Sequence, residues 1–142
     1  MTEELTEKTI GKAIDKAAEF LDKIVGPALS DIGGILSDEI RFFRLKNQIR
    51  IVQKAEAYFV KKGIEPVKVP LKILAPLLEY GSLEEDEIIQ DKWASLLIHA
   101  ADPGTSNRFS TIFTELLKQL TSLEVIILEK IYNDYLGRFK TK

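Results

Sequence analysis

Residues 82–136 decide the fold; they read SLEEDEIIQDKWASLLIHAADPGTSNRFSTIFTELLKQLTSLEVIILEKIYNDYL. Apolar residues recur along this stretch at steps of three and four, which places them on one face of an α-helix. Asp102-Pro103-Gly104 is typical of a turn. We expect three consecutive helices, whose apolar faces are, in chain order, Ile89, Trp93, Leu96, Leu97 and Ala100; Ile112, Phe113, Leu116, Leu117 and Leu120; and Val125, Ile127, Leu128, Ile131, Tyr132 and Tyr135.

Two of these helices begin with the residues of a capping box. In that motif a Ser or Thr hydroxyl and a carboxylate three residues later bind free backbone amides at the start of a helix. Ser82 with Glu85, and Thr121 with Glu124, have this spacing. The two pairs predict where the first and the third helix begin.

The first 63 residues have the pattern of two amphipathic helices. Between Thr6 and Val25 apolar residues recur at helical steps until Gly26-Pro27 interrupts them. Pro27 suits the first turn of the next helix, in which Gly33-Gly34 is a weak point. This second helix is long and ends at Lys61-Lys62-Gly63, because basic residues favour the last turn of a helix and Gly commonly follows it.

Prolines mark the segment between these two parts. Pro66 and Pro70 bracket a short extended piece, and Pro70 begins a short helix that contains Pro76 and ends at Gly81. Gly137 is expected to end the last helix. The sequence thus predicts an all-α, single-domain helical bundle of about five to six helices with a long central helix. Its parts are residues 1–63 with two amphipathic helices, 64–81 with the Pro-rich connector and a short helix, 82–137 with three capped helices, and 138–142 as a loose tail.

The composition is that of one ordinary folded domain. The 142 residues are 45% hydrophobic and 30% charged, which is enough apolar content for one core. There is no cysteine, which excludes thiol catalysis and thiolate-bound metal sites and fits a reducing compartment. No run approaches the roughly 20 apolar residues of a membrane-spanning helix. The start is acidic and lacks the features of a secretory signal, so we expect a cytoplasmic protein.

Basic residues lie among aromatic ones along the expected long helix. Such a stripe can contact the phosphates of nucleic acid or an acidic lipid surface. The plain interpretation is the solvent face of an amphipathic helix, and the net charge of −2 argues against a general nucleic-acid binder. The residues that could contact a partner or an anionic surface are Arg41, Arg44, Lys46, Arg50 and Lys54, with Phe42, Phe43 and Tyr58 nearby in the sequence.

Candidate reaction chemistry is sparse. Glu84, Glu87 and Asp91 share a helix face and could bind a hard cation, but carboxylates in a first helical turn also stabilise the helix dipole, which we prefer. His99 is the sole histidine, and no HExxH or GxSxG motif surrounds it. The Lys-Ser/Thr that follows a phosphate-binding glycine turn is absent. We therefore predict no catalytic residue, no metal ligand and no cofactor, and a protein that is not an enzyme.

Three pieces of the sequence carry a family resemblance: FFRLKNQIRIVQKA at 42–55, VPLKILAPLLEYGSLEEDEIIQDKWASLLIHAADP at 69–103, and LKQLTSLEVIILEKIY at 117–132. Together they resemble the abortive infection alpha (Abi-alpha) family of bacterial proteins. The resemblance implies a connection with phage defence, in which an infected cell stops growing or dies, and it implies no known reaction. Three residues match the family pattern and also have structural explanations, as core anchor, polar helix contact and helix cap: Trp93, Asn47 and Glu85.

We accordingly expect a non-enzymatic helical interaction module linked to phage defence by resemblance, acting through protein–protein association. A protein partner or self-association requires an apolar face left open, on the first helix or along residues 42–59. The alternative is an effector that binds an anionic membrane or nucleic acid through the basic helix 41–54. The last helix also begins like a winged-helix DNA-binding domain, which would need a recognition helix and a β-hairpin after it. No small-molecule substrate is indicated.

Overall fold

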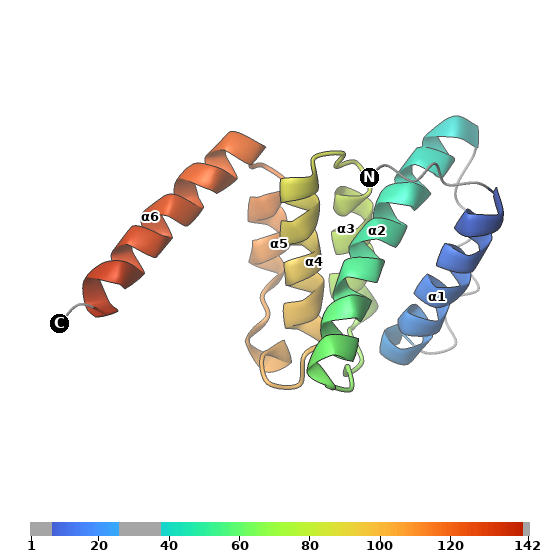
Figure 1. The fold of residues 1–142 in the computed structure, drawn as a ribbon, viewed down its shortest axis with the longest axis horizontal. Helices are drawn as coiled ribbons and strands as arrows, with labels where there is room; N and C mark the ends of the chain where they lie inside the picture. Colours follow the sequence, from blue (N-terminus) through green and yellow to red (C-terminus); the bar gives the residue numbers. More distant parts are fainter. Residues whose placement is uncertain (1–6, 26–37, 141–142) are drawn as a thin grey trace.

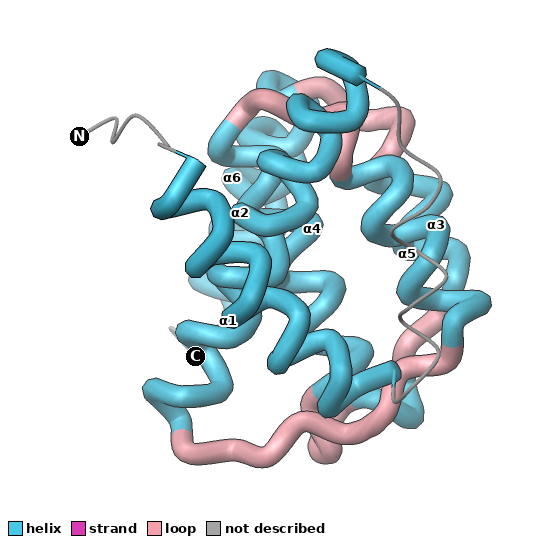
Figure 2. The backbone as a smooth tube through the Cα atoms, turned by 90° about the vertical axis from the view of Figure 1, so that its right-hand side faces the viewer, coloured by secondary structure: helices cyan, strands magenta, loops and turns pink. Residues whose placement is uncertain are grey.

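Residues 7–25 and 38–140 are described in the computed structural model of the chain, and helices joined by loops make up both ranges (Figure 1, Figure 2). No strand occurs in either range, so the prediction of an all-α fold is confirmed. The elements are α1 (Glu7–Val25), α2 (Asp38–Lys62), α3 (Leu71–Gly81), α4 (Glu87–Ala101), the short 3₁₀ helix η2 (Ser106–Arg108), α5 (Thr111–Leu117) and α6 (Ser122–Lys140).

Helices α1 to α5 form the body of the molecule, with the long helix α2 between α1 and α4 (Figure 1). α3 packs against α2 and α4, and α5 packs against α3 and α4. The core lies between α2, α3 and α4, where Ile51, Leu77 and Trp93 are at most 1% exposed. α1 adds Phe20 and Ile24 to this core, because its apolar face turns toward α2.

Gly81 allows α3 to end close against α2 and α4. A Cβ at this position would lie 2.7 Å from Cδ1 of Ile51 and 3.3 Å from Cγ of Trp93. Both neighbours are buried, so no larger side chain fits without displacing core atoms. Gly81, which the sequence predicts as the end of a helix, thus also allows α3 to pack closely against α2 and α4.

Two predicted helix ends are confirmed. α2 ends at Lys62, and Gly63 follows in the left-handed region with φ of 64°, where glycine has no steric penalty. At the start of α6, Thr121 and Glu124 form the predicted capping box. The backbone amide of Thr121 donates to Oε1 of Glu124 at 3.2 Å, and the amide of Glu124 donates to Oγ1 of Thr121 at 3.3 Å.

The predicted capping box of Ser82 and Glu85 is wrong. The N-cap of α4 is Asp86, whose carboxylate accepts a hydrogen bond from the backbone amide of Ile88 at 2.8 Å. Ser82 is buried at the end of α3, where its hydroxyl donates to the carbonyl of Glu79. The helix therefore starts four residues later than the sequence pattern indicated, since the acidic run offers more than one capping carboxylate.

The predicted end of the last helix at Gly137 is also wrong. α6 continues through Gly137 to Lys140, so Arg138 and Lys140 lie in its last turn instead of in a loose tail. Basic residues there are favourable, because they meet the negative end of the helix dipole. Pro76 lies inside one continuous helix α3. The features predicted for Gly26-Pro27 and Gly33-Gly34 lie outside the described residues.

Helix α6 leaves the body as an arm (Figure 1). Near its start Val125 is buried, and Glu129 forms an ion pair with Lys92 of α4. The helical spacing predicts that some combination of the apolar residues of this helix is buried, but only Val125 is, since the arm diverges from the body beyond that point. The other residues of the predicted apolar face are exposed: Ile127, Leu128, Ile131, Tyr132 and Tyr135.

Candidate functional site

A buried polar network joins α2 to the turn between α3 and α4. Asn47 is 1% exposed; its side-chain amide donates to the carbonyl of Ser82 at 2.9 Å, and its side-chain oxygen accepts from the amide of Gln90 at 3.1 Å. Gln90 also donates to the carbonyl of Glu84 at 2.8 Å. Buried polar groups require such partners, so the network fixes the path of the turn. Asn47 is the polar helix contact that the sequence predicted.

Two of the five basic residues proposed as a contact stripe on α2 make internal contacts. Nε of Arg44 donates to Oγ of Ser82 at 2.8 Å, which adds Arg44 to the network around the α3–α4 turn. Nζ of Lys54 forms ion pairs with the carboxylates of Asp91 and Glu87 on α4. These two cations are therefore partly neutralised within the chain.

The three other basic residues of the stripe are Lys46, Arg50 and Arg41. Lys46 and Arg50 are half-buried, and their side chains form no hydrogen bond or ion pair with the described part of the chain. Arg41 belongs to α2, but its side chain lies outside the described residues. Contact of this stripe with a partner or an anionic surface stays a prediction, carried mainly by Lys46 and Arg50.

The acidic residues near the start of α4 serve the helix and its neighbour. Glu87 lies in the first turn of α4, where a carboxylate meets the positive end of the helix dipole. Asp91 faces Lys54 of α2, as Glu87 does, while Glu84 precedes the helix. Within residues 7–25 and 38–140, no three His, Asp or Glu side chains are grouped so that they could hold a metal ion.

His99 lies against the aromatic residues that follow α4. Its ring centroid is 6.0 Å from that of Phe109 and 6.2 Å from that of Phe113. The side chain is half-buried, and its Nε2 is shielded from solvent without a hydrogen-bond partner in the described part of the chain. The aromatic surroundings place this ring in the packing between α4 and α5.

Lys118 ties the end of α5 to α3. Its Nζ pairs with Glu115 at 2.7 Å and lies 4.5 Å from the centroid of the Tyr80 ring. The hydrogen bond to Glu115, with a weaker one to the Tyr80 hydroxyl, raises the pKa of Lys118 above its ordinary value. These contacts fix the direction in which the chain leaves α5 toward α6.

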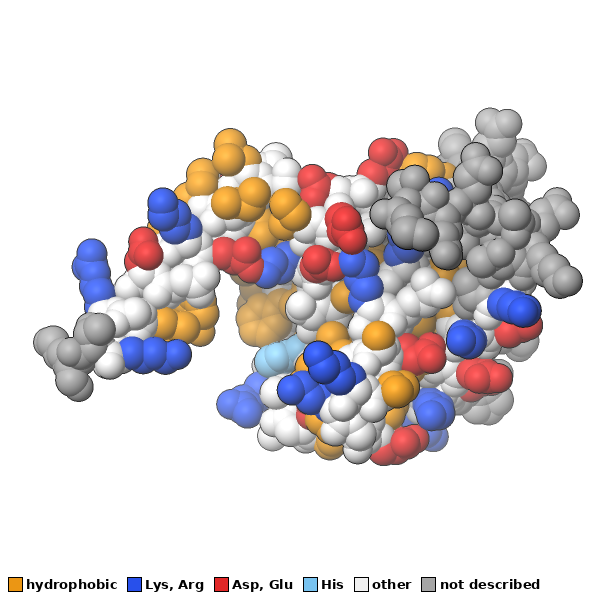
Figure 3. Space-filling model, in the orientation of Figure 1, with side chains coloured by type: hydrophobic (Ala, Val, Ile, Leu, Met, Phe, Trp, Pro, Cys, Tyr) orange, Lys and Arg blue, Asp and Glu red, His pale blue; other side chains and the backbone are white. Residues whose placement is uncertain are grey.

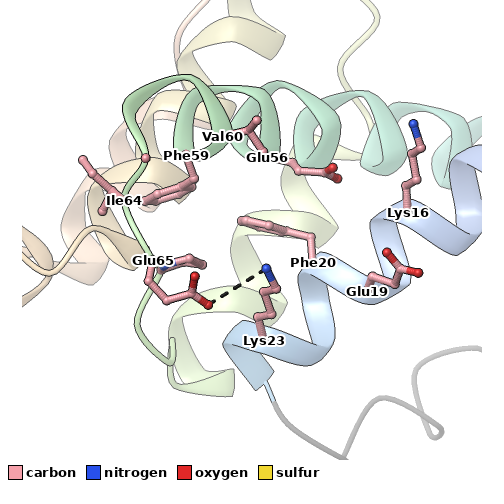
Figure 4. Close-up of a pocket in the computed structure, with 11 residues that line it drawn as sticks. Lys16, Glu19, Phe20, Lys23, Glu56, Phe59, Val60, Ile64 and Glu65 are labelled. Atoms are coloured by element: carbon pink, nitrogen blue, oxygen red, sulfur yellow. Dashed lines mark ion pairs between the residues drawn. The ribbon is translucent and has the colours of Figure 1, made fainter.

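A pocket of about 350 Å³ lies between α1, α2 and the loop after α2 (Figure 4). The rings of Phe20 and Phe59, with centroids 5.9 Å apart, form its apolar floor. Lys23 and Glu65 form an ion pair of 3.9 Å at its edge, and both side chains are more than half exposed. Solvated charges of both signs attract a ligand only weakly, so the pocket does not by itself define a binding chemistry.

The most unusual surface of the molecule is the exposed apolar side of α6. A hydrophobic residue left in solvent is ordinary when it is single, but a continuous patch of this kind marks a contact site. Ile131 is 60% exposed, Tyr132 61% and Phe139 64%. Figure 3 shows hydrophobic side chains on the upper part of this arm near the body and on its lower side near the C-terminal end. The α6 apolar surface, as we call it, consists of Leu123, Ile127, Leu128, Ile131, Tyr132, Tyr135 and Phe139.

The neighbouring helix α5 extends the exposed apolar area. Ile112 is 61% exposed, Leu116 55% and Phe113 39%. The spacing placed all three on the apolar stripe of this helix, and we expected an open apolar face on the first helix or along residues 42–59. In those places Phe20 and Phe59 are buried against each other at the α1–α2 contact, whereas Phe43 is 39% exposed. The three-and-four spacing showed that α6 has an apolar side, but no local signal showed that this side is uncovered.

The fold and the exposed surface define an all-α protein with a helical body and a projecting helix that exposes apolar side chains. The chain belongs to the Abortive infection alpha family, whose model matches residues 37–141, from the start of α2 to the end of α6. Membership links the chain to abortive infection and confirms the resemblance seen in the sequence. No curated protein and no solved structure matches the chain. In the described ranges, no helix has the length and apolarity needed to cross a membrane.

Proposed function

We propose that this protein is a non-enzymatic helical module that acts in abortive infection through protein–protein association, with the α6 apolar surface as its contact site. The observation that carries the proposal is the exposure of seven large apolar side chains along one side of this helix. Taking about 200 Å² for a fully exposed large side chain, their exposed fractions amount to about 800 Å². The largest apolar patch on an ordinary monomer covers roughly 300–600 Å².

Helix α6 also lies within the segment that defines the family. The family match extends to residue 141 and includes the whole of α6, so the sequence of the arm belongs to the matched segment. The module catalyses no reaction, and the absence of cysteine suits it to a reducing cytoplasm.

A phage-challenge assay in bacteria that express the full chain tests the proposal. Ile131→Asp places a charge in the α6 apolar surface and should abolish protection. Asn133→Asp adds the same charge on the polar side of the same helix and should retain it. Far-UV circular dichroism of both purified variants checks that the body stays folded. Protection by Ile131→Asp at the wild-type level would overturn the proposed contact site.

The non-enzymatic part of the proposal has its own test. Glu87→Gln and Asp91→Asn remove carboxylates that a hydrolytic mechanism would need, yet they disturb only a solvated ion pair with Lys54. Both variants should protect as well as the wild type. Loss of protection in a variant that folds normally would instead indicate catalysis.

A second candidate is binding to an anionic membrane or nucleic acid through the basic part of α2. The observation that favours it is that Lys46 and Arg50 form no ion pair with the described residues. Against it, Arg44 and Lys54 are engaged by groups of the chain itself. We rank this function second because two cations supply little binding energy at physiological salt.

A further inference from the structure

We propose that two copies of this chain exchange their arms, so that α6 of each copy packs on the exposed face of α5 of the other. The inference rests on the proposed function, which requires an associating partner and does not identify it. Two apolar faces of the same chain are uncovered, and contacts within the chain hold them apart. A second copy supplies to each face the surface that it lacks.

The first of these faces continues the side by which α6 touches the body. Of the residues of α6, only Val125 is buried. The apolar residues that follow it at alternating steps of three and four lie in line with it on one side of the helix, as in the contact seam of a coiled coil. They are 51% to 64% exposed. The α6 seam, as we call it, consists of Leu128, Tyr132, Tyr135 and Phe139.

The charged residues near the middle of α6 do not interrupt this seam. Lys130 and Asp134 each stand two residues from Tyr132, and two residues correspond to about 200° of helical turn. Both charges therefore lie on the other side of the helix. Glu129, at the edge of the seam, is paired with Lys92 of α4. A surface that covers the seam thus meets aromatic and aliphatic atoms without burying Lys130 or Asp134.

Helix α5 presents the second uncovered face. Its inner side holds Thr114 and Leu117 in the body, and its outer side carries the three exposed residues described above. The α5 face, as we call it, consists of Ile112, Phe113 and Leu116. Figure 3 shows an open space between the arm and the body, with hydrophobic side chains on either side of it. Aromatic rings occur in both the seam and the α5 face, and such rings pack favourably on one another.

Within one copy, the seam is held away from the α5 face. Only four residues, 118–121, join the two helices. Lys118 is fixed by Glu115 and by the Tyr80 ring, and the capping box at Thr121 follows directly. The first turns of α6 are also held by their contacts with α4, and from there the helix leads away from the body (Figure 1). Exchange between two copies covers both faces while these contacts stay in place.

The two faces together have the area that a stable dimer needs. By the same estimate of about 200 Å² for each fully exposed side chain, the seam offers about 500 Å² and the α5 face about 300 Å². A specific interface of standard size buries about 800 Å² on each partner. In a two-fold exchange each copy contributes one seam and one α5 face, so the sum of about 800 Å² applies to each copy.

Sedimentation equilibrium of the full chain tests the association. The wild type should be dimeric at micromolar concentration. Tyr132→Asp in the seam and Leu116→Asp in the α5 face should each raise the dissociation constant at least about 100-fold, because each charge enters both contacts of the dimer. Asn133→Asp on α6 and Thr111→Asp on α5 add the same charge outside the two faces and should remain dimeric. A wild type that is monomeric up to about 1 mM, or dimers that either variant in the faces leaves intact, would overturn the inference.

Mixing the two variants tests whether the seam meets the α5 face. A mixed pair contains one contact between an unchanged seam and an unchanged α5 face, since both substitutions fall in the other contact. Either variant alone has a substitution in both contacts. The mixture of Tyr132→Asp with Leu116→Asp should therefore dimerise more tightly than either variant by itself. A mixture as weak as its components would show that each face meets its own copy and would overturn the exchange.

A cross-link distinguishes a second copy from the chain's own arm, since the chain has no cysteine of its own. With a flexible bifunctional maleimide, the double variant Leu116→Cys/Tyr132→Cys should link between chains and give a dimer on a denaturing gel. A control that carries Leu116→Cys with Asn133→Cys should link much less. A link formed mainly within one chain would show that α6 folds back on its own α5 and would overturn the exchange.

The two proposals fail in different ways. If the chain is monomeric and Ile131→Asp still abolishes phage protection, the second copy is wrong but the contact site stands. Recruitment of the monomer to lipid vesicles, lost in Tyr132→Asp, would likewise replace the second copy by a membrane surface. If Tyr132→Asp and Leu116→Asp disrupt the dimer and protection persists in both, the dimer stands and the proposed function falls.

Discussion

Replacing Gly81 with Ala should destabilise the body of the molecule, because the new Cβ would occupy space already filled. It would lie 2.7 Å from Cδ1 of Ile51, whereas ordinary contacts between carbon atoms begin near 3.5 Å. Ile51 is fully buried and Trp93 is 1% exposed, so neither side chain can move into solvent. Overpacking of this kind costs about 1–3 kcal/mol, and the better helix propensity of Ala returns a part of it. We expect a net loss of about 1–2 kcal/mol.

Thermal unfolding followed by circular dichroism measures this loss. For a chain of this size it corresponds to a fall in Tm of about 3–8 °C. Gly137→Ala is the matched control, because it makes the same change in a helix where the added Cβ has no described atom within 4 Å. The control should leave Tm unchanged or raise it slightly, since Ala favours the helix.

The effect of Gly81→Ala should depend on the side chain that it meets. Ile51→Val removes the Cδ1 atom and alone costs about 0.5–1.5 kcal/mol. In the double variant the new methyl group takes the vacated space, so the combined loss should be smaller than the sum of the two single losses. Strictly additive losses, or a Gly81→Ala variant as stable as the wild type, would refute the close contact that we assign to this glycine.

Three other variants test the polar network and the basic stripe. Asn47→Leu should lower the free energy of unfolding by about 2–3 kcal/mol, measured by urea titration, because the carbonyl of Ser82 loses its buried donor. A loss below about 0.5 kcal/mol would contradict the structural role of the network. If the chain binds anionic vesicles or DNA at low salt, replacing Lys46 and Arg50 together by Gln should abolish the binding. Lys54→Gln should preserve the binding, since Lys54 is already ion-paired. Equal effects of the two substitutions would exclude the stripe as the site.

The sequence predicted those helix ends whose determinants are local. Thr121 and Glu124 cap α6 with groups three residues apart, and Gly63 ends α2 through its own backbone conformation. The prediction that Ser82 caps α4 is wrong because the side chain of Ser82 has a partner that is distant in the sequence. Arg44, 38 residues earlier, donates to its hydroxyl, so Ser82 stabilises a contact between helices and Asp86 remains as the cap of α4. Local spacing cannot distinguish these two uses of a serine.

Helix α6 shows a different limit of sequence-based prediction, and this limit is informative about function. A spacing of three and four places apolar residues on a helix side that is most stable when another surface covers it. The usual inference is that the same chain supplies this surface, but the described residues leave most of α6 uncovered. The pattern and the exposure together therefore imply a covering surface outside the described body.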